Sequence, residues 1–69
     1  MNFKIREGEE FIKLGQLLKA CNLVSNGGEA KERILSGEVK VNGEVETARG
    51  KKIKPGDTVS FADTSIDVS

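Results

Sequence analysis

Basic residues gather in one short part of this sequence. Residues 47–56 contain four of them and no acid, whereas residues 7–10 and 57–69 contain acids and no base. The four are Arg49, Lys51, Lys52 and Lys54. Because salt screens charges beyond about 10 Å, such a local patch governs affinity for phosphate more than the net charge does. The stretch indicates a small anion-binding surface, and a solvated turn kept soluble by its lysines is the alternative.

A predicted helix start is a second feature that suits phosphate. Asn26 can cap this helix, and Glu29 three positions later completes a pattern resembling a capping box. The helix start would present the free backbone N–H groups of Gly27 and Gly28, which form a natural seat for an anion. Lys31 lies within the next turn of the same helix.

Lys40, on the strand predicted to follow, extends this set of bases. Residues 29–54 hold seven bases and five acids, a surplus of two bases. These bases either form a binding surface or merely offset their acidic neighbours, and the charge pattern alone leaves both interpretations open.

The composition excludes several kinds of chemistry. The chain has 69 residues, with 11 Lys plus Arg, 11 Asp plus Glu and no His. Without His there is no imidazole base and no His metal ligand, and the lone Cys21 excludes an internal disulfide framework or a thiolate-rich zinc site. We therefore expect no enzyme activity, no catalytic residue, no metal and no cofactor. Cys21 itself is expected to pack as a small hydrophobic residue.

The apolar pattern predicts the elements that position these residues. Near the N-terminus, apolar and polar residues alternate, which predicts a strand over residues 2–6. From Phe11 to Val24 apolar residues recur at spacings of three and four, which predicts a helix. Gly15 interrupts its first turns and marks a frayed start or a close contact.

A second short helix is predicted over residues 29–36, with Gly37 as its stop. The pair Asn42-Gly43 predicts a tight β-hairpin, since both turn positions require a positive φ. A turn at Pro55-Gly56 leads into a strand at residues 58–61. A last strand contains Ile66 and Val68 and can pair with residues 2–6.

These elements predict one domain, residues 1–69, of the α+β class. A helical hairpin packs on a small antiparallel sheet, to which the N- and C-terminal strands are added. No apolar run is long enough for a membrane span, and the first residues lack the apolar core of a signal peptide. We expect a cytoplasmic protein without membrane contact that acts as a monomer.

Four ordered segments of this sequence resemble the ribosomal-protein-S-four-type RNA-binding domain, also called the alpha-L motif. The resemblance covers about two-thirds of the chain, and its flanks are similar to the short free-standing bacterial members. The segments are Leu17 to Ser25, Glu29-Ala30-Lys31, Gly37 to Gly43 and Lys54-Pro55-Gly56-Asp57.

The resemblance implies that the chain binds structured RNA, ribosomal or transfer RNA, with possible association with the ribosome. It points to bases on the second helix and neighbouring loops, with Asn42 and Gly43 shaping the hairpin; these bases are Lys31, Lys40, Arg49, Lys51 and Lys52. Many family members carry an Arg where this chain has Gly27. Gly27 and Gly28 would compensate by letting backbone amides approach a phosphate, so Gly28→Ala is expected to weaken binding while leaving the fold intact.

With few aromatic residues, recognition through the backbone and shape of folded RNA is favoured over stacking on single strands. One alternative is a protein-interaction module that docks on a ribosomal or RNA-processing partner through its mixed-charge helix face. Another is a helix-turn-helix DNA-binding protein, which is disfavoured because a third helix is missing and the second helix is short and carries acids.

Overall fold

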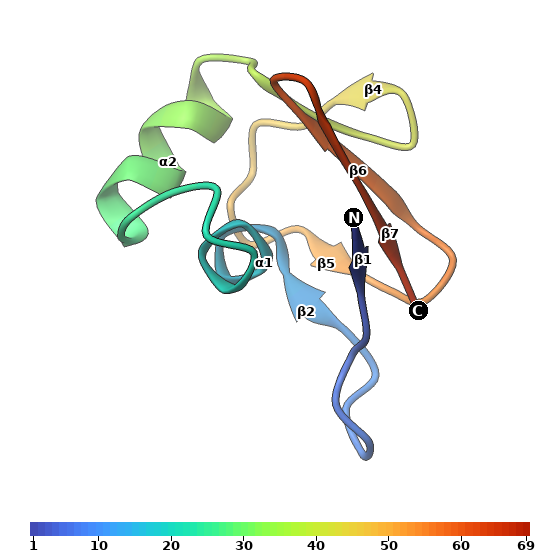
Figure 1. Cartoon of the computed structure of the whole chain (residues 1–69). Coiled ribbons are helices and arrows are strands. Elements are labelled where there is room, and N and C mark those ends of the chain that lie inside the picture. The colour runs from blue at the N-terminus through green and yellow to red at the C-terminus, as the bar shows by residue number, and fades with distance from the viewer.

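The computed structural model describes residues 1–69 and contains two helices and seven strands (Figure 1). The helices are α1 (Leu14–Ala20) and α2 (Gly27–Leu35). The strands are β1 (Asn2–Phe3), β2 (Ile12–Lys13), β3 (Val39–Val41), β4 (Glu44–Val45), β5 (Lys52–Ile53), β6 (Thr58–Phe61) and β7 (Thr64–Val68). Neither helix is long and apolar enough to cross a membrane.

Five strands form the main sheet in the order β1-β7-β6-β3-β4, and β2 pairs with β5 in a separate two-stranded sheet. The two helices lie together on one side of the main sheet (Figure 1). The predicted α+β class and the predicted pairing of the two terminal strands are confirmed. The sheet is mixed rather than wholly antiparallel, because β1 runs parallel to β7, with Asn2 opposite Asp67.

The hydrophobic core lies between the helices and the sheet. All 13 buried residues are hydrophobic, and no polar or charged residue is buried. The fully buried side chains come from α1, α2 and four strands; the largest are Leu14, Leu17, Leu18, Ile34, Ile53, Ile66, Val39 and Val59. The burial of Ala30 and Ile34 on α2 agrees with the predicted inward face of that helix.

Helix α1 is shorter at both ends than the sequence predicts. It begins at Leu14 because Ile12 is taken into β2, where it pairs with Ile53 of β5. It ends at Ala20 because Asn22 adopts a left-handed φ of 58°, which turns the chain out of the helix. Val24 is still buried, but from the loop between the helices.

Helix α2 begins with the predicted cap. The side chain of Asn26 accepts a hydrogen bond from the Glu29 N–H at 2.9 Å. The Glu29 carboxylate accepts from the backbone N–H of Ser25 at 2.6 Å, one residue earlier than in a standard capping box. The β3–β4 turn also has the predicted form, with φ of 52° at Asn42 and 86° at Gly43.

Candidate functional site

A groove lined by basic residues lies where the starts of both helices meet the loop before β5. We call it the basic groove; its volume is about 280 Å³. Four of its lining residues, Gly15, Gly27, Ala30 and Gly50, contribute small or no side chains, and no acidic residue lines it. Its polar side chains are those of Lys13, Gln16, Lys19 and Arg49.

Backbone hydrogen bonds attach the loop to the start of α1. The N–H of Leu14 donates to the carbonyl of Lys51 at 2.9 Å, and the N–H of Gly15 donates to the carbonyl of Arg49 at 3.0 Å. These carbonyls satisfy N–H groups that the first turn of a helix leaves free, and Lys13 at the N-cap makes no side-chain cap. The loop thereby caps the helix and places Arg49 at the groove.

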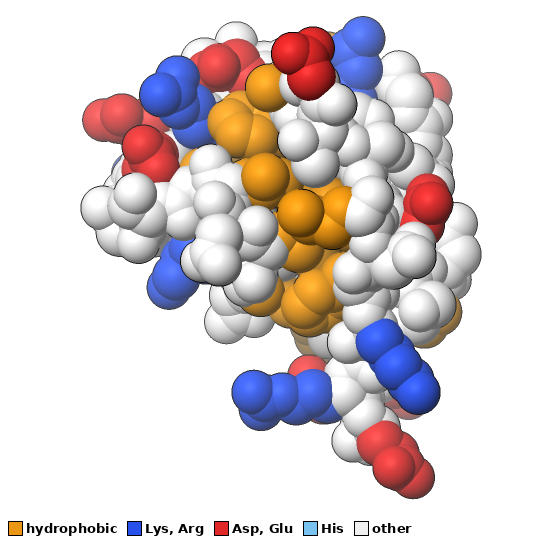
Figure 2. Space-filling model, in the orientation of Figure 1, with side chains coloured by type: hydrophobic (Ala, Val, Ile, Leu, Met, Phe, Trp, Pro, Cys, Tyr) orange, Lys and Arg blue, Asp and Glu red, His pale blue; other side chains and the backbone are white.

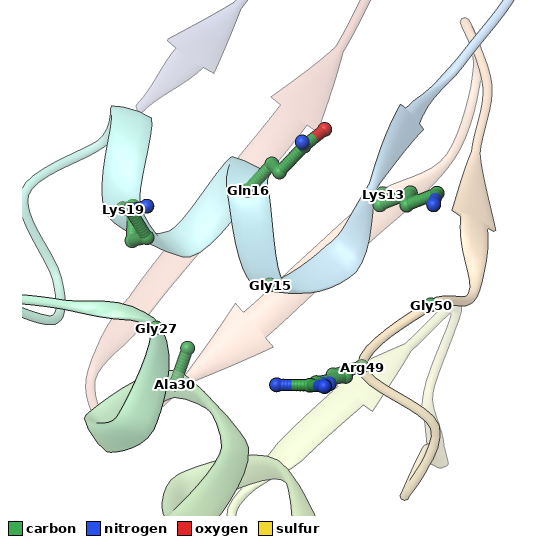
Figure 3. A pocket seen from close by; sticks show the side chains of 8 residues that line it. All are labelled: Lys13, Gly15, Gln16, Lys19, Gly27, Ala30, Arg49 and Gly50. Carbon is green, nitrogen blue, oxygen red and sulfur yellow. The ribbon is translucent and has the colours of Figure 1, made fainter.

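Gly15 allows this close approach. A Cβ at this position would lie 3.6 Å from the Cβ and the carbonyl oxygen of Arg49, and 3.9 Å from the Cβ of Ala30. Of the two explanations offered by the sequence, a close contact is therefore the correct one. Figure 3 shows the guanidinium of Arg49 extending across the groove toward Ala30 and the start of α2.

The start of α2 forms the opposite wall. The N–H groups of Gly27 and Gly28 donate to no acceptor within the chain. They carry the partial positive charge of a helix N-terminus, which favours an anion. Gly27 lines the groove directly, on the wall that faces Arg49 (Figure 3).

Lys13 and Lys52 are direct partners in the β2–β5 pair. Like charges in this position repel each other unless an anion lies between them or one side chain turns away. Lys52 turns away, since its Nζ lies 5.0 Å from the centroid of the Phe11 ring, whereas Lys13 lines the basic groove.

The cations of the groove are not neutralised by the chain. The molecule contains one ion pair, between Arg33 and Glu38 at 3.4 Å, and both of its side chains are exposed. Lys13, Lys19 and Arg49 therefore have no acidic partner within 4 Å. Two segments of the chain bring them to one concave surface: residues 13–19, which start and form α1, and the loop that carries Arg49.

Only part of the predicted site is brought together here. Gly27 and Arg49 line the groove, and Gly28 follows directly on α2. Lys51 instead lines a mixed-charge depression with Asn42 and Asp57, and Lys31, Lys40 and Lys52 lie outside both hollows.

The side chain of Asn42 is held within the chain. Its Nδ2 donates to Asp57 Oδ1 at 3.1 Å, and its Oδ1 accepts from the Thr58 N–H at 2.9 Å. The pKa of Asp57 lies below its ordinary value, first because its carboxylate accepts from the Lys54 N–H and second because it accepts from the Asn42 amide. Asn42 is thus fixed as a residue that shapes the hairpin.

Sequence reasoning missed Lys13, Gln16 and Lys19. Lys13 and Lys19 stand six positions apart on the polar side of the α1 segment. The signal available was their common face with Gln16, but only the packing of the Arg49 loop against α1 turns that face into a groove.

The chain contains no cluster of side chains suited to a metal ion. No group of three or more Cys, Asp or Glu side chains is placed to hold a metal ion. Cys21 is half-buried against the core, as expected, and burial raises the pKa of its thiol.

The chain is similar to several known proteins. The family model described as S4 domain matches residues 3–69. The "Putative RNA-binding protein YbcJ" of Escherichia coli (strain K12) is 46% identical over 57 residues, covering 83% of this chain and 81% of the relative. The "Probable ribosome maturation protein RlbA" of Bacillus subtilis (strain 168) is 44% identical over 52 residues, covering 75% of this chain and 73% of the relative.

The solution structure of E. coli YbcJ, described as revealing an alpha-L motif involved in RNA binding, matches with a TM-score of 0.70. The two are 40% identical, and the match covers 97% of this chain and 84% of the other. These likenesses support the expectation of a binding domain rather than an enzyme. The family model spans nearly the whole chain, and the chain therefore belongs to the S4 domain family.

Proposed function

We propose that this S4 domain binds structured RNA and that the basic groove holds the RNA backbone. Lys13, Lys19 and Arg49 would neutralise phosphates, and the free N–H groups of Gly27 and Gly28 would donate to a phosphate oxygen. The observation that carries the proposal is the convergence of three unpaired cations and a free helix N-terminus on one groove without acids.

The relatives support the class of ligand. One is named as an RNA-binding protein and another as a ribosome maturation protein. By this likeness we propose ribosomal RNA as the ligand, with transfer RNA as the other structured candidate, and association with ribosomal particles. We also propose that the domain acts in the cytoplasm as a monomer.

Recognition through RNA shape and backbone suits this surface. The groove contains no aromatic side chain, so it offers bases no aromatic stacking platform. The chain has only three aromatic residues, and Phe11 is already covered by the Lys52 ammonium. Phosphate contacts then dominate, and affinity falls with salt in proportion to the number of phosphates neutralised.

A charge-reversal series tests the proposal. Fluorescence anisotropy with a labelled ribosomal RNA hairpin and with a transfer RNA measures affinity across a salt series for wild type, Arg49→Glu and Lys19→Glu. Each reversal should weaken binding at least tenfold and reduce the slope of log K against log salt by about 0.9. Lys54→Glu is the matched control, because Lys54 belongs to the same basic stretch but does not line the groove.

Two outcomes would refute the groove assignment. Equal losses for Lys54→Glu and Arg49→Glu would mean that RNA responds to overall charge alone. A flat salt dependence of the wild type would exclude phosphate contacts. Lys31→Glu, Lys40→Glu and Lys52→Glu extend the series to the predicted bases outside the groove, and smaller losses are expected for them.

A further inference from the structure

A second groove, with an apolar floor, lies between strand β1 and helix α1. Its volume is about 520 Å³. The floor is made by Phe3, Ile5, Ile12 and Ala20, of which Ala20 is exposed and Phe3 and Ile12 are half-buried. Figure 2 shows hydrophobic side chains as a stripe on this face, between the helices and strands β1 and β7, with two basic side chains near its lower end. We call this surface the β1–α1 groove.

The strand that borders this groove has a free edge. β1 is the outermost strand of the main sheet. The carbonyl of Phe3 accepts from the Ser69 N–H at 2.9 Å, and the N–H of Ile5 donates to the Ser69 carbonyl at 2.7 Å. Between them, the N–H and C=O of Lys4 make no hydrogen bond within the chain. Because alternate residues of a strand direct their backbone groups to opposite sides, those of Lys4 are directed away from β7.

The rim of the groove is basic. Lys4 and Arg6 alternate with Phe3 and Ile5, so they lie on the other face of the same segment. Neither has an acidic partner within 4 Å. Glu9 is the one acid at this groove.

We propose that the β1–α1 groove binds an extended segment of a partner protein that alternates apolar and acidic residues. The segment adds as a strand to the edge of β1, with its backbone bonded to the N–H and C=O of Lys4. Its apolar side chains lie on the floor beside Ile5 and Ala20, and its acidic side chains face Lys4 and Arg6. Gln16 lines both this groove and the basic groove, so protein and RNA would be held side by side.

The other occupants fit less well. RNA has no repeating N–H and C=O groups to match a strand edge, and the floor offers it no phosphate contact. A second copy of this chain pairing through β1 would set Lys4 and Arg6 against the same cations of its partner. Of these occupants, only a peptide that alternates acidic and apolar residues can pair with the Lys4 N–H and C=O, cover the apolar floor and neutralise the basic rim.

The test titrates the uniformly ¹⁵N-labelled full chain with a synthetic hexapeptide of sequence Asp-Val-Glu-Ile-Asp-Val, blocked at both ends. A Lys-Val-Lys-Ile-Lys-Val peptide keeps the alternation and reverses the charge. We expect saturable amide shifts at residues 3–6, Ile12 and Ala20 with the acidic peptide only. Hydrogen exchange of the Lys4 N–H should slow at least tenfold in the complex, which a purely electrostatic contact would not produce.

Two variants and a control sharpen the result. Lys4→Glu combined with Arg6→Glu should weaken binding of the acidic peptide at least tenfold. Ala20→Glu should do the same, because it places a negative charge on the floor against the acidic peptide. All three side chains are exposed, so the fold is retained. Lys54→Glu, outside the groove, should leave peptide binding unchanged.

Several results would overturn the proposal. These are absence of saturable shifts with the acidic peptide, equal shifts with the lysine peptide, or unchanged exchange at Lys4. A twelve-residue oligouridylate that shifts residues 3–6 and Ala20 more than the peptide does would assign the groove to RNA. Shifts at β1 that grow with protein concentration alone would assign it to self-association.

Discussion

Asn42 and Asp57 connect two turns of the sheet that are 15 residues apart. The Nδ2 of Asn42 donates to Asp57 Oδ1 at 3.1 Å, while Asp57 Oδ2 accepts from the Lys54 N–H at 2.8 Å. The β3–β4 turn and the Pro-Gly turn before β6 are thereby held by one carboxylate. Asn42 also occupies a left-handed position, so one residue supplies both the turn geometry and the connection.

Replacing Asn42 by Asp should destabilise the fold at neutral pH. The variant retains the acceptor for the Thr58 N–H but sets a second carboxylate against Asp57. Hydrogen bonds to charged groups contribute roughly 1.5–3 kcal/mol, so we expect a loss of about 2 kcal/mol in the free energy of unfolding, measured by urea denaturation. The loss should shrink toward pH 4, because protonation removes the repulsion. Asn42→Gly, which keeps the positive φ and adds no charge, should show no such recovery.

The wild-type chain should lose stability in acid through Asp57. The Lys54 N–H, and then the Asn42 amide, hold the pKa of Asp57 below its ordinary value. A group whose pKa is lower in the folded state stabilises the fold above its unfolded pKa, about 3.9 for Asp, and this contribution is lost as the pH falls through the folded pKa. Urea denaturation between pH 6 and pH 2 should show the free energy of unfolding decreasing as the pH is lowered. In Asp57→Asn this decrease should be smaller.

Glu38 gives a matched comparison for that titration. The Ser36 hydroxyl, and then the Arg33 guanidinium, lower the pKa of Glu38, so its effect has the same sign. Its side chain is exposed, and solvent weakens the interaction. Glu38→Gln should therefore reduce the loss of unfolding free energy between pH 6 and pH 2 by less than Asp57→Asn does. A larger effect of Glu38→Gln would contradict this account.

Local signals made most of the fold predictable from sequence. Asn42-Gly43 specifies its turn through backbone conformation alone, and Asn26 caps α2 through a bond to a residue three positions away. The pairing of Ile12 with Ile53 was not predictable in this way. The two residues are far apart in the chain and each belongs to a two-residue strand, so neither leaves a periodic signal.

The candidate site was predictable only in part for the same reason. Arg49 and Gly27 stand out in the sequence through charge clustering and helix-start chemistry. Lys13 and Lys19 join them only because carbonyls of the Arg49 loop cap α1, which is a tertiary contact. Lys51 belongs to the same basic stretch as Arg49 but lies in another depression, since a local charge run does not fix a common face.

Substitutions at Gly15 test the shape of the basic groove without changing its charge. Gly15→Ala places its Cβ at ordinary contact distance from Arg49 and should stabilise the chain by up to about 1 kcal/mol, since Ala is the better helix residue. Gly15→Val adds bulk toward the loop and should displace Arg49, weakening RNA binding several-fold without changing the net charge. Thermal denaturation and the RNA anisotropy assay measure the two effects. Equal RNA affinity of the Val and Ala variants would contradict a role for the shape of this groove.

The start of α2 offers a way to strengthen the proposed RNA site. A Cβ at Gly27 meets no atom within 4 Å, so this position has open space for a side chain at the basic groove. We expect Gly27→Arg to raise RNA affinity several-fold and to steepen the salt slope by about 0.9. A cation at a helix N-terminus should cost about 0.3–1 kcal/mol of stability.

The control at the start of α2 must be made at Gly27 and not at Gly28. A Cβ at Gly28 would lie 3.3 Å from the Oδ1 of Asn26, which is the atom that caps α2. Gly28→Ala therefore requires this cap atom to shift by a few tenths of an ångström, so a loss of RNA affinity in this variant would not report on the amide contact alone. Gly27→Ala keeps the backbone N–H and its Cβ meets no atom within 4 Å, so it is the matched reference for the added charge of Gly27→Arg. If Gly27→Arg binds RNA no more tightly than Gly27→Ala, the phosphates of the bound RNA do not lie near the start of α2.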